Sequence, residues 1–222
     1  MSADYPTQSL FREDPGLMRM SNQDRERTVG LVLCGGAGRR MGGKDKGLIE
    51  VDGQPAVLRA LKLLRPFCDH QFISANRNRE VYAQLGAKLG VNEVIADLRQ
   101  GYQGPLAGLE ALFPALDQLS KCRRIVLLPC DLPRLSTTVP RLLLAELDAR
   151  PGVDIVYASA GNQHHYLCAA IRRPALATLS QHLDQGVRAV RDWYGLCSSA
   201  VLVFGDDLTD NFVNVNTLRA GD

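Results

Sequence analysis

Short apolar runs rich in Val, Ile and Leu alternate with segments of helical period along this chain, and this alternation constrains the fold more than any other feature. A strand–helix–strand repeat of this kind predicts βαβ units and a parallel sheet. The run RRIVLLPC is apolar on both faces after its two arginines, which is typical of a central strand buried on both sides. The expected strands are residues 29–34, 71–75, 91–96 and 123–130, and the expected helices lie near residues 55–66, 79–89, 105–119 and 137–149.

The pattern changes after Pro151. Two strand-like runs, DIVYASA and YLCAAIRR, are joined by the turn-like GNQHH, two short helices are expected around residues 174–194, and SAVLVFGD reads as a last strand. The fold class predicted is therefore α/β, a Rossmann-like three-layer sandwich with a mostly parallel central sheet and antiparallel additions in the C-terminal half. Residues 1–27 show no sustained period and are expected to be a mobile leader, followed by a single domain over residues 28–222.

Composition excludes several classes of function. The formal net charge of +2 is too small for a general nucleic-acid or membrane-surface binder. The six cysteines are scattered without a C-x-x-C pair, so we expect reduced, mostly buried thiols and no zinc site. The chain contains neither a stretch of ~18–20 apolar residues nor the apolar segment of a secretory signal near its start, and we expect a cytoplasmic protein.

The loop after the first expected strand, CGGAGRRMGGKDKG, places bare backbone beside positive charge. Two known phosphate patterns nearly fit, but Met41 stands where the dinucleotide fingerprint needs a small residue, and Asp45 replaces the Ser or Thr of a P-loop. Glycines can still turn backbone N–H groups toward one anion, and Arg and Lys side chains can pair with phosphate oxygens. The glycines concerned are Gly35, Gly36 and Gly38, and the cations are Arg39, Arg40, Lys44 and Lys46. The alternative is a surface turn with solvated charges.

Acidic residues follow two of the other expected strands. Asp131 comes directly after RRIVLLPC, at the end of a strand where ligands of open α/β sheets gather. It could hold Mg²⁺ against phosphates, or it could be a helix N-cap or a turn aspartate. Asp97 opens the glycine-bearing loop DLRQGYQGPLAG, which includes Gly104. Its carboxylate could accept hydrogen bonds from the ring N–H and exocyclic amine of guanine, a donor pair that adenine lacks, or could serve as a turn residue.

Five segments together resemble the molybdenum cofactor guanylyltransferases, a family within the wider nucleotidyltransferase group. They are LVLCGGAGRRMGGKDKG, SANR (residues 74–77), GPLAG (104–108), LPCDLP (128–133) and FVNVNT (212–217). The glycine-rich signature marks the wider group, whereas GPLAG, PCDLP and NVNT in this order are more specific. The resemblance covers the chain from about Thr28 to Thr217 and implies a single nucleotidyltransferase domain there.

The resemblance implies transfer of GMP from GTP to the terminal phosphate of molybdopterin, with Mg²⁺ required and pyrophosphate released. It places nucleotide contacts on Leu33, Cys34, Gly35, Lys46, Ser74 and Asp97, the magnesium ligand on Asp131, and the pterin side on Arg40, Gly43, Arg188, Asn214 and Asn216. Gly36 and Gly104 join the expected GTP contacts, and Arg40, Lys46 and Asp131 are the expected catalytic residues. On the residues alone, the two asparagines could equally satisfy loop backbone, and Arg188 could be a solvated arginine on a short helix.

Other readings stay open. A related enzyme could use CTP or another acceptor, and a non-catalytic protein could bind GTP and pterin only to deliver them. Further expected partners are proteins of cofactor biosynthesis and recipient molybdoenzymes or their chaperones, with no nucleic acid and no membrane. Some positions depart from the family pattern: Cys34 stands for a common alanine, Ser74 for an asparagine and Leu218 for a proline, and the segment His164-His165-Tyr166 also differs.

Overall fold

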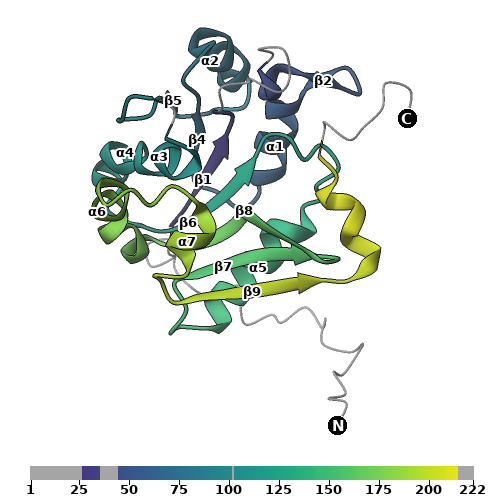
Figure 1. Cartoon of the computed structure of the whole chain (residues 1–222). Coiled ribbons are helices and arrows are strands. Elements are labelled where there is room, and N and C mark those ends of the chain that lie inside the picture. The colour runs from purple at the N-terminus through teal and green to yellow at the C-terminus, as the bar shows by residue number, and fades with distance from the viewer. Residues whose placement is uncertain (1–26, 36–44, 102, 215–222) are drawn as a thin grey trace.

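The computed structural model describes residues 27–35, 45–101 and 103–214 of the 222-residue chain (Figure 1). The expected leader, residues 1–27, lies outside this part of the chain except for Arg27, which begins the first strand. From there to residue 149 the elements are β1 (Arg27–Leu33), η3 (Lys46–Leu48), β2 (Glu50–Val51), β3 (Gln54–Pro55), α1 (Ala56–Leu64), β4 (His70–Ser74), α2 (Arg79–Ala87), β5 (Glu93–Ile95), α3 (Pro105–Glu110), α4 (Phe113–Gln118), β6 (Cys122–Pro129) and α5 (Thr138–Ala149).

Seven strands form one twisted sheet in the order β5-β4-β1-β6-β8-β7-β9 (Figure 1). The pairs β5–β4, β4–β1 and β1–β6 are parallel, as the strand–helix alternation predicts. The pairs β6–β8 and β8–β7 are antiparallel, and β7–β9 is parallel again. The α/β class with a mostly parallel first half and antiparallel additions after residue 151 is therefore confirmed.

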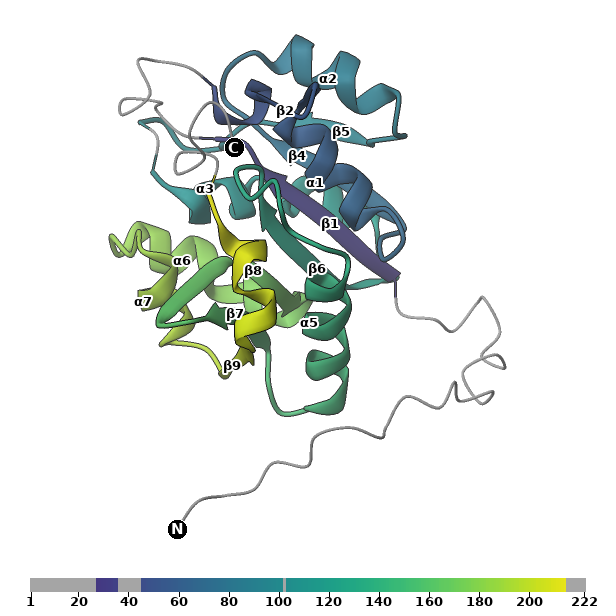
Figure 2. The same ribbon diagram turned by 90° about the vertical axis from the view of Figure 1, so that its right-hand side faces the viewer.

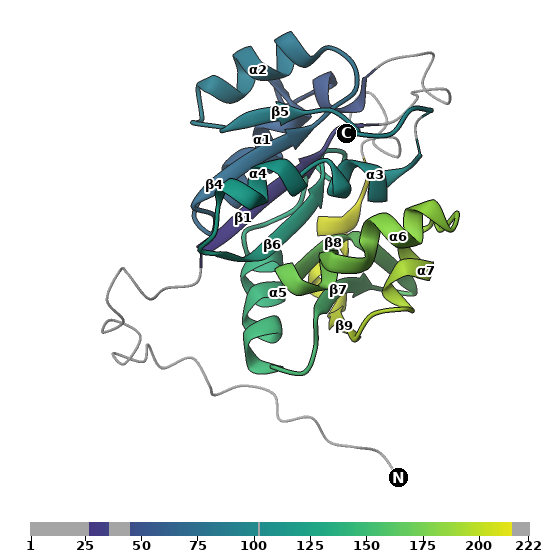
Figure 3. The ribbon, with the colours of Figure 1, turned by 90° about the vertical axis from the view of Figure 1, so that its left-hand side faces the viewer.

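Helices cover both faces of the sheet and give the three layers expected. One core joins the sheet to α1, α2 and α5, which Figure 2 shows on one face. A second core joins it to α3, α4, α6 (Leu179–Asp184) and α7 (Val190–Tyr194), which Figure 3 shows on the other. Successive residues of β1 enter the two cores in turn, with Leu31 in the second and Val32 in the first. Because a central strand serves two cores, its sequence is apolar without alternation.

The helix expected over residues 105–119 is wrong as a single element. Two helices, α3 and α4, replace it, and the break falls just before Pro114. Proline has no N–H to donate to the carbonyl of Glu110, and its ring would clash with that carbonyl in a continuous helix. Leu112 instead makes a tighter turn by donating to the carbonyl of Leu109 at 3.2 Å.

The hairpin in the C-terminal half has a shorter turn than GNQHH. Strands β7 (Ile155–Ala160) and β8 (Gln163–Arg172) leave only residues 161–162 between them, and Gly161 adopts φ of 55° there. The two histidines therefore belong to β8. The pairing also skips, because Tyr157 faces Ala169 whereas Ala158 faces His165, so residues 166–168 bulge out of the ladder.

The remaining elements are short. They are the 3₁₀ helix η4 (Arg173–Thr178), α6, α7, β9 (Ser199–Phe204) and a closing 3₁₀ helix, η5 (Asp206–Phe212). The interpretation of Arg188 as a helical residue is wrong, since it precedes α7 in the loop after α6. Within the described residues, no helix has both the length and the apolar character needed to span a membrane.

Candidate active site

The carboxyl ends of the parallel strands bring the sequence-predicted residues to one edge of the sheet. Backbone hydrogen bonds continue the ladder past the strands themselves: Cys34 N–H donates to the carbonyl of Ser74 at 2.9 Å, and Cys130 N–H donates to that of Leu33 at 3.1 Å. These bonds hold the starts of the loops after β1, β4 and β6 side by side. A ligand bound to one of these loops therefore lies against the others, as the rule for open α/β sheets predicts.

Two side chains from distant parts of the chain bind Asp131 at this edge of the sheet. Its Oδ2 atom accepts a hydrogen bond from Lys46 Nζ at 2.8 Å and another from Asn214 Nδ2 at 2.8 Å. The two donors come from residues 85 and 83 positions away in the chain. The Asp131 side chain is 15% exposed and the Lys46 side chain 37% exposed. One carboxylate oxygen thus joins a nucleotide-side residue and a pterin-side residue of the prediction.

Lys46 is held in place through its two neighbours. Asp45 accepts hydrogen bonds from the hydroxyl of Tyr82 and from Asn78 Nδ2, the latter at 3.2 Å. Gly47 packs against the same tyrosine so closely that a Cβ there would lie 2.5 Å from Tyr82 Oη. Burial is the main cause that raises the pKa of Tyr82, so its hydroxyl stays protonated and donates to the carboxylate. These contacts hold the backbone on both sides of Lys46, and the bond to Asp131 holds the end of its side chain.

The other residues expected around the nucleotide lie deeper than Lys46. Leu33 and Cys34 are buried, and burial raises the pKa of the Cys34 thiol well above its usual range, so the thiol is inert and only backbone can face a ligand. Ser74 is buried beneath α3: a Cβ on Gly108 would come within 2.6 Å of its Oγ. Gly35 lies beside Asn76, whose Nδ2 is 3.9 Å from the position a Cβ on Gly35 would take.

Asp97 is bound to Asn76 by two reciprocal hydrogen bonds. Asn76 Nδ2 donates to Asp97 Oδ2 at 2.7 Å, and the backbone N–H of Asp97 donates to Asn76 Oδ1 at 2.8 Å. Burial raises the pKa of Asp97, the bond from Asn76 lowers it, and the charge of Glu110 raises it further. Asn76 is a residue that the sequence analysis missed, although it lies within the SANR segment singled out there.

A groove of about 600 Å³ opens next to Asp131 on the side of the antiparallel strands. Its lining includes Asn214, Arg188 and the β8 residues His164 to Cys168, some of which the bulge pushes out of the ladder. His165 stacks on Phe212 with ring centroids 4.4 Å apart, and burial lowers its pKa, which favours the neutral imidazole. Tyr166 packs against Tyr157 at 5.0 Å. The groove thus combines aromatic surface with a cation and an amide.

Arg188, which lines this groove, lies next to Gly104. Arg188 donates through Nη1 to the carbonyls of Leu183 at 2.5 Å and Val187 at 3.0 Å. Gly104 adopts φ of 88°, and a Cβ there would lie 3.5 Å from the carbonyl oxygen of Arg188. The loop expected to hold GTP therefore touches the loop expected to hold the pterin.

Four residues of the predicted site lie outside the described residues, namely Gly36, Arg40, Gly43 and Asn216. The structure gathers the other predicted residues, Leu33, Cys34, Gly35, Lys46, Ser74, Asp97, Gly104, Asp131, Arg188 and Asn214, at the same edge of the sheet or in the groove beside it. The side chains that the sequence analysis missed are those that anchor others: Asp45 and Tyr82 beside Lys46, and Asn76 beside Asp97. Each pairs with a residue far away in the chain, and no local pattern marks such a pair.

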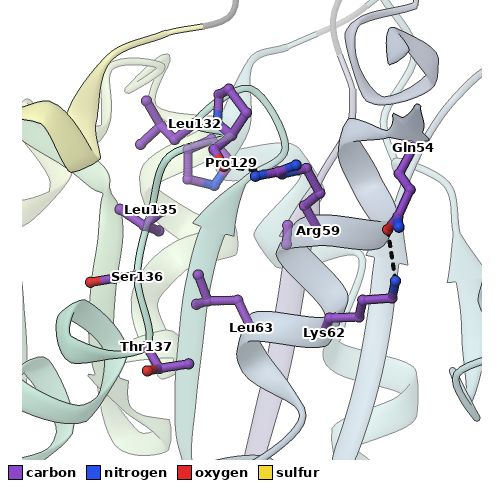
Figure 4. A pocket seen from close by; sticks show the side chains of 11 residues that line it. Gln54, Arg59, Lys62, Leu63, Pro129, Leu132, Leu135, Ser136 and Thr137 are labelled. Atoms are coloured by element: carbon purple, nitrogen blue, oxygen red, sulfur yellow. Dashed lines mark hydrogen bonds between the residues drawn. The ribbon is translucent and has the colours of Figure 1, made fainter. Parts of the chain in front are cut away.

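A second, smaller pocket of about 420 Å³ lies behind the loop that carries Asp131 (Figure 4). Pro129 and Leu132 line both hollows, so this loop is the wall between them. In the second pocket Lys62 Nζ donates to Gln54 Oε1 at 2.7 Å, and Arg59 Nε donates to the carbonyl of Pro133 at 3.1 Å. None of the predicted site residues lines it.

The chain is similar to known proteins over most of its length. A family model described as a MobA-like NTP transferase domain matches residues 30–198. A molybdenum cofactor guanylyltransferase of Shewanella putrefaciens is 35% identical over 189 residues, covering 85% of this chain and 91% of the relative. Another, of Burkholderia ambifaria, is 37% identical over 203 residues, covering 89% of this chain and 95% of the relative.

The fold is also similar to that of solved structures. The crystal structure of molybdopterin-guanine dinucleotide biosynthesis protein A from Archaeoglobus fulgidus superposes with a TM-score of 0.63 at 23% identity. The match covers 85% of this chain and 92% of that one. At this level of identity the likeness supports the three-layer fold described above.

Proposed function

Since the chain belongs to the MobA-like NTP transferase family, as a molybdenum cofactor guanylyltransferase, we propose that it transfers GMP from GTP to molybdopterin. In this reaction an oxygen of the terminal phosphate of molybdopterin forms a bond to the α-phosphorus of GTP. The bond from that phosphorus to the oxygen bridging to the β-phosphate breaks, and pyrophosphate leaves. The product is molybdopterin guanine dinucleotide.

The observation that carries this proposal is the Asp131 carboxylate, bound at once by Lys46 and by Asn214. The resemblance makes Lys46 a nucleotide contact and Asn214 a residue of the pterin side, and Asn214 lines the groove beside Asp131. A transferase that joins two substrates must bring both to one point. Asp131 is such a point between the parallel and antiparallel parts of the sheet.

The carboxylate of Asp131 is also a type of ligand that suits the magnesium ion that the family implies. Mg²⁺ binds through one or two carboxylates and completes its shell with water and substrate phosphates. Within the described residues no three or more acidic, His or Cys side chains are arranged so that they could hold a metal ion, but Asp131 offers one partly buried carboxylate facing the groove. When bound there, Mg²⁺ would neutralise charge on the phosphates.

The chemistry asks for positive charge and position rather than for a general base. The attacking phosphate oxygen is already anionic at neutral pH, so no proton has to be removed first. What opposes the reaction is repulsion between two polyanions, and two unit charges ~4 Å apart interact by ~1 kcal/mol in water but ~4 kcal/mol at an effective dielectric near 20. Lys46, clamped by its neighbours and partly withdrawn from water, can exchange its carboxylate partner for a phosphate oxygen and offset this repulsion.

Guanine selection is assigned to Asp97. An ionised carboxylate accepts hydrogen bonds only, and guanine presents two neighbouring donors where adenine presents none in that arrangement. The bond from Asn76 favours the ionised form and partly offsets the effect of burial on the pKa of Asp97. Asn76, which binds Asp97, lies beside Gly35, and this adjacency supports a base bound next to the phosphate loop.

The test is to incubate the full chain with Mg²⁺, purified molybdopterin and GTP, CTP or ATP in separate reactions. We expect the guanine dinucleotide, identified by mass, together with pyrophosphate. The cytosine dinucleotide as the main product would instead assign a cytidylyltransferase. Binding of GTP with no pyrophosphate released in the presence of molybdopterin would favour the delivery protein.

Two variants locate the chemistry. Lys46→Ala should raise the activation free energy of GMP transfer by on the order of 2–4 kcal/mol, by analogy with loss of one preorganised donor. Asp131→Asn should abolish turnover, and added Mg²⁺ should not restore it. Asp52→Asn is the matched control, because Asp52 also pairs with a cation, Arg59 Nη1 at 2.7 Å, but is largely exposed and outside the groove. Its φ of 50° is a conformation that asparagine tolerates well. Wild-type rates for Lys46→Ala would remove Lys46 from the mechanism.

A further inference from the structure

The side chain of Asn76 extends the pairing of two strands beyond the point where the backbone ladder ends. In the parallel pair β4–β5, Ser74 faces Ile95, and the next rung is made by Ala75 N–H donating to the carbonyl of Ile95 at 2.9 Å. Two residues further along each chain, Asn76 faces Asp97. There the N–H of Asp97 donates to the side-chain Oδ1 of Asn76 at 2.8 Å, instead of to a backbone carbonyl.

The second bond of this pair acts on the carboxylate. Asn76 Nδ2 donates to Asp97 Oδ2 at 2.7 Å, so one amide binds both the backbone and the side chain of the same aspartate. The bond from the backbone N–H holds the amide of Asn76 in place, and the bond from its Nδ2 then holds the carboxylate in one orientation. An ionised carboxylate has about four acceptor positions, so the bond from Asn76 leaves room for the two donors of a guanine edge.

We propose that Asn76 is a positioning residue that orients the Asp97 carboxylate for the selection of guanine over other purines. This inference rests on the proposed use of GTP. Only an amide of this length supplies an acceptor for the N–H of Asp97 and a donor for its carboxylate together. An aspartate at position 76 would keep the shape and the acceptor but would place a second carboxylate against Asp97.

Asn92 provides a matched comparison at the other end of the same strand pair. Its Oδ1 accepts a hydrogen bond from the backbone N–H of Gln71 at 2.9 Å. This bond also links β4 to β5 through an asparagine side chain, but at the amino ends of the strands, on the edge away from Asp131. A purely structural effect of losing such a bond should therefore appear equally in Asn92→Ala and in Asn76→Ala.

The experiment compares the affinities of the full chain for GTP and for ITP, in the presence of Mg²⁺, by isothermal titration calorimetry. Inosine keeps the ring N–H of guanine and lacks its exocyclic amine, so the ratio of the two dissociation constants measures the contact with that amine. We expect the wild type and Asn92→Ala to prefer GTP by about 10- to 100-fold, the range for a hydrogen bond to a charged group. Asn76→Ala and Asn76→Asp should bind GTP more weakly and bring the ratio close to one, with thermal melts like that of Asn92→Ala.

The variant Asp97→Asn distinguishes failure of the positioning role of Asn76 from failure of the proposed base selection. If Asp97→Asn loses the preference while both Asn76 variants keep the wild-type ratio, the positioning role is overturned and the use of GTP stands. If the wild type binds GTP and ITP equally, or does not bind GTP, the positioning role and the proposed base selection fall together. Loss of the preference in Asn92→Ala as well would show a general effect of strand pairing and would also overturn the proposal.

Discussion

The close contact between Gly47 and Tyr82 allows a quantitative prediction about the clamp on Lys46. Replacing Gly47 with alanine would place a Cβ 2.5 Å from Tyr82 Oη and 3.0 Å from Tyr82 Cε1, with Cys34 Sγ at 3.1 Å. Tyr82 is fully buried, so the ring has no free space in which to swing aside. Overpacking of this kind costs ~1–3 kcal/mol of the free energy of unfolding.

The hydroxyl of Tyr82 gives the second arm of the experiment. Tyr82→Phe removes the hydrogen bond to the Asp45 carboxylate, and hydrogen bonds to charged groups contribute ~1.5–3 kcal/mol. Tyr82→Phe removes the oxygen that the new methyl group of Gly47→Ala meets most closely, and the crowding in Gly47→Ala already weakens the hydrogen bond that Tyr82→Phe removes, so the double variant should cost about as much as the larger of the two single changes. We therefore expect a coupling free energy between positions 47 and 82 equal to the smaller of the two single costs, ~1–3 kcal/mol, above the ~0.3–0.5 kcal/mol scatter of independent sites.

Urea unfolding of the wild type, the two single variants and the double variant measures this coupling. A loss of 1 kcal/mol corresponds to ~2–4 °C in Tm for a chain of this size, so thermal melts give an independent reading. Gly152→Ala is the control, since no atom lies within 4 Å of the position its Cβ would take. Additive effects at positions 47 and 82, or a Gly47→Ala variant as stable as Gly152→Ala, would refute the reasoning.

Three further predictions follow from charges and burial. Arg99 Nε donates to the buried Glu110 at 2.7 Å and lowers the pKa of that carboxyl. The resulting stability is present above the ordinary pKa of glutamate and is lost as the pH falls through the lowered value. Arg99→Ala should therefore remove this acid dependence of the free energy of unfolding, as urea unfolding at several pH values can measure. Burial raises the pKa of Asp97, so the affinity for GTP should begin to weaken at a higher pH than it would with an exposed aspartate. Calorimetric titrations of GTP at several acidic pH values measure this loss of affinity. A loss whose midpoint lies at the ordinary pKa of aspartate would contradict the prediction. Burial raises the pKa of the Cys68 thiol to about 12 and raises that of Cys34 well above its usual range. Iodoacetamide at pH 8 should therefore label neither thiol until urea unfolds the chain, and mass spectrometry can follow the labelling. Rapid labelling of the native protein would contradict the prediction.

Periodicity predicts this fold well where packing against the sheet decides the structure, and less well where one residue interrupts it. The strand over residues 123–130 is found as β6 because burial on both faces leaves a continuous apolar run. The helix over residues 105–119 was expected to be continuous because its leucines keep a helical spacing through Pro114. There the missing N–H and the proline ring outweigh the apolar pattern.

The candidate site was likewise predicted only in part. The rule that ligands lie at the carboxyl ends of parallel strands predicts that Lys46 and Asp131 share one edge, and they are found 2.8 Å apart. The two hydrogen bonds between Asn76 and Asp97 were not predicted, because an amide in a loop looks the same in sequence whether it satisfies a turn or orients a carboxylate. Its partner is 21 residues away and is brought close only by the register of β4 and β5.

The bond between Lys46 and Asp131 also bears on how the protein behaves when metal is scarce. The chain supplies its own counterion to this carboxylate, so folding does not require a divalent cation to neutralise it. Domains built around structural zinc behave in the opposite way, because they unfold when a chelator removes the ion. For this chain we therefore expect the fold to form without a bound metal, and a chelator should lower its melting temperature by no more than the Mg²⁺ that it removes had raised it.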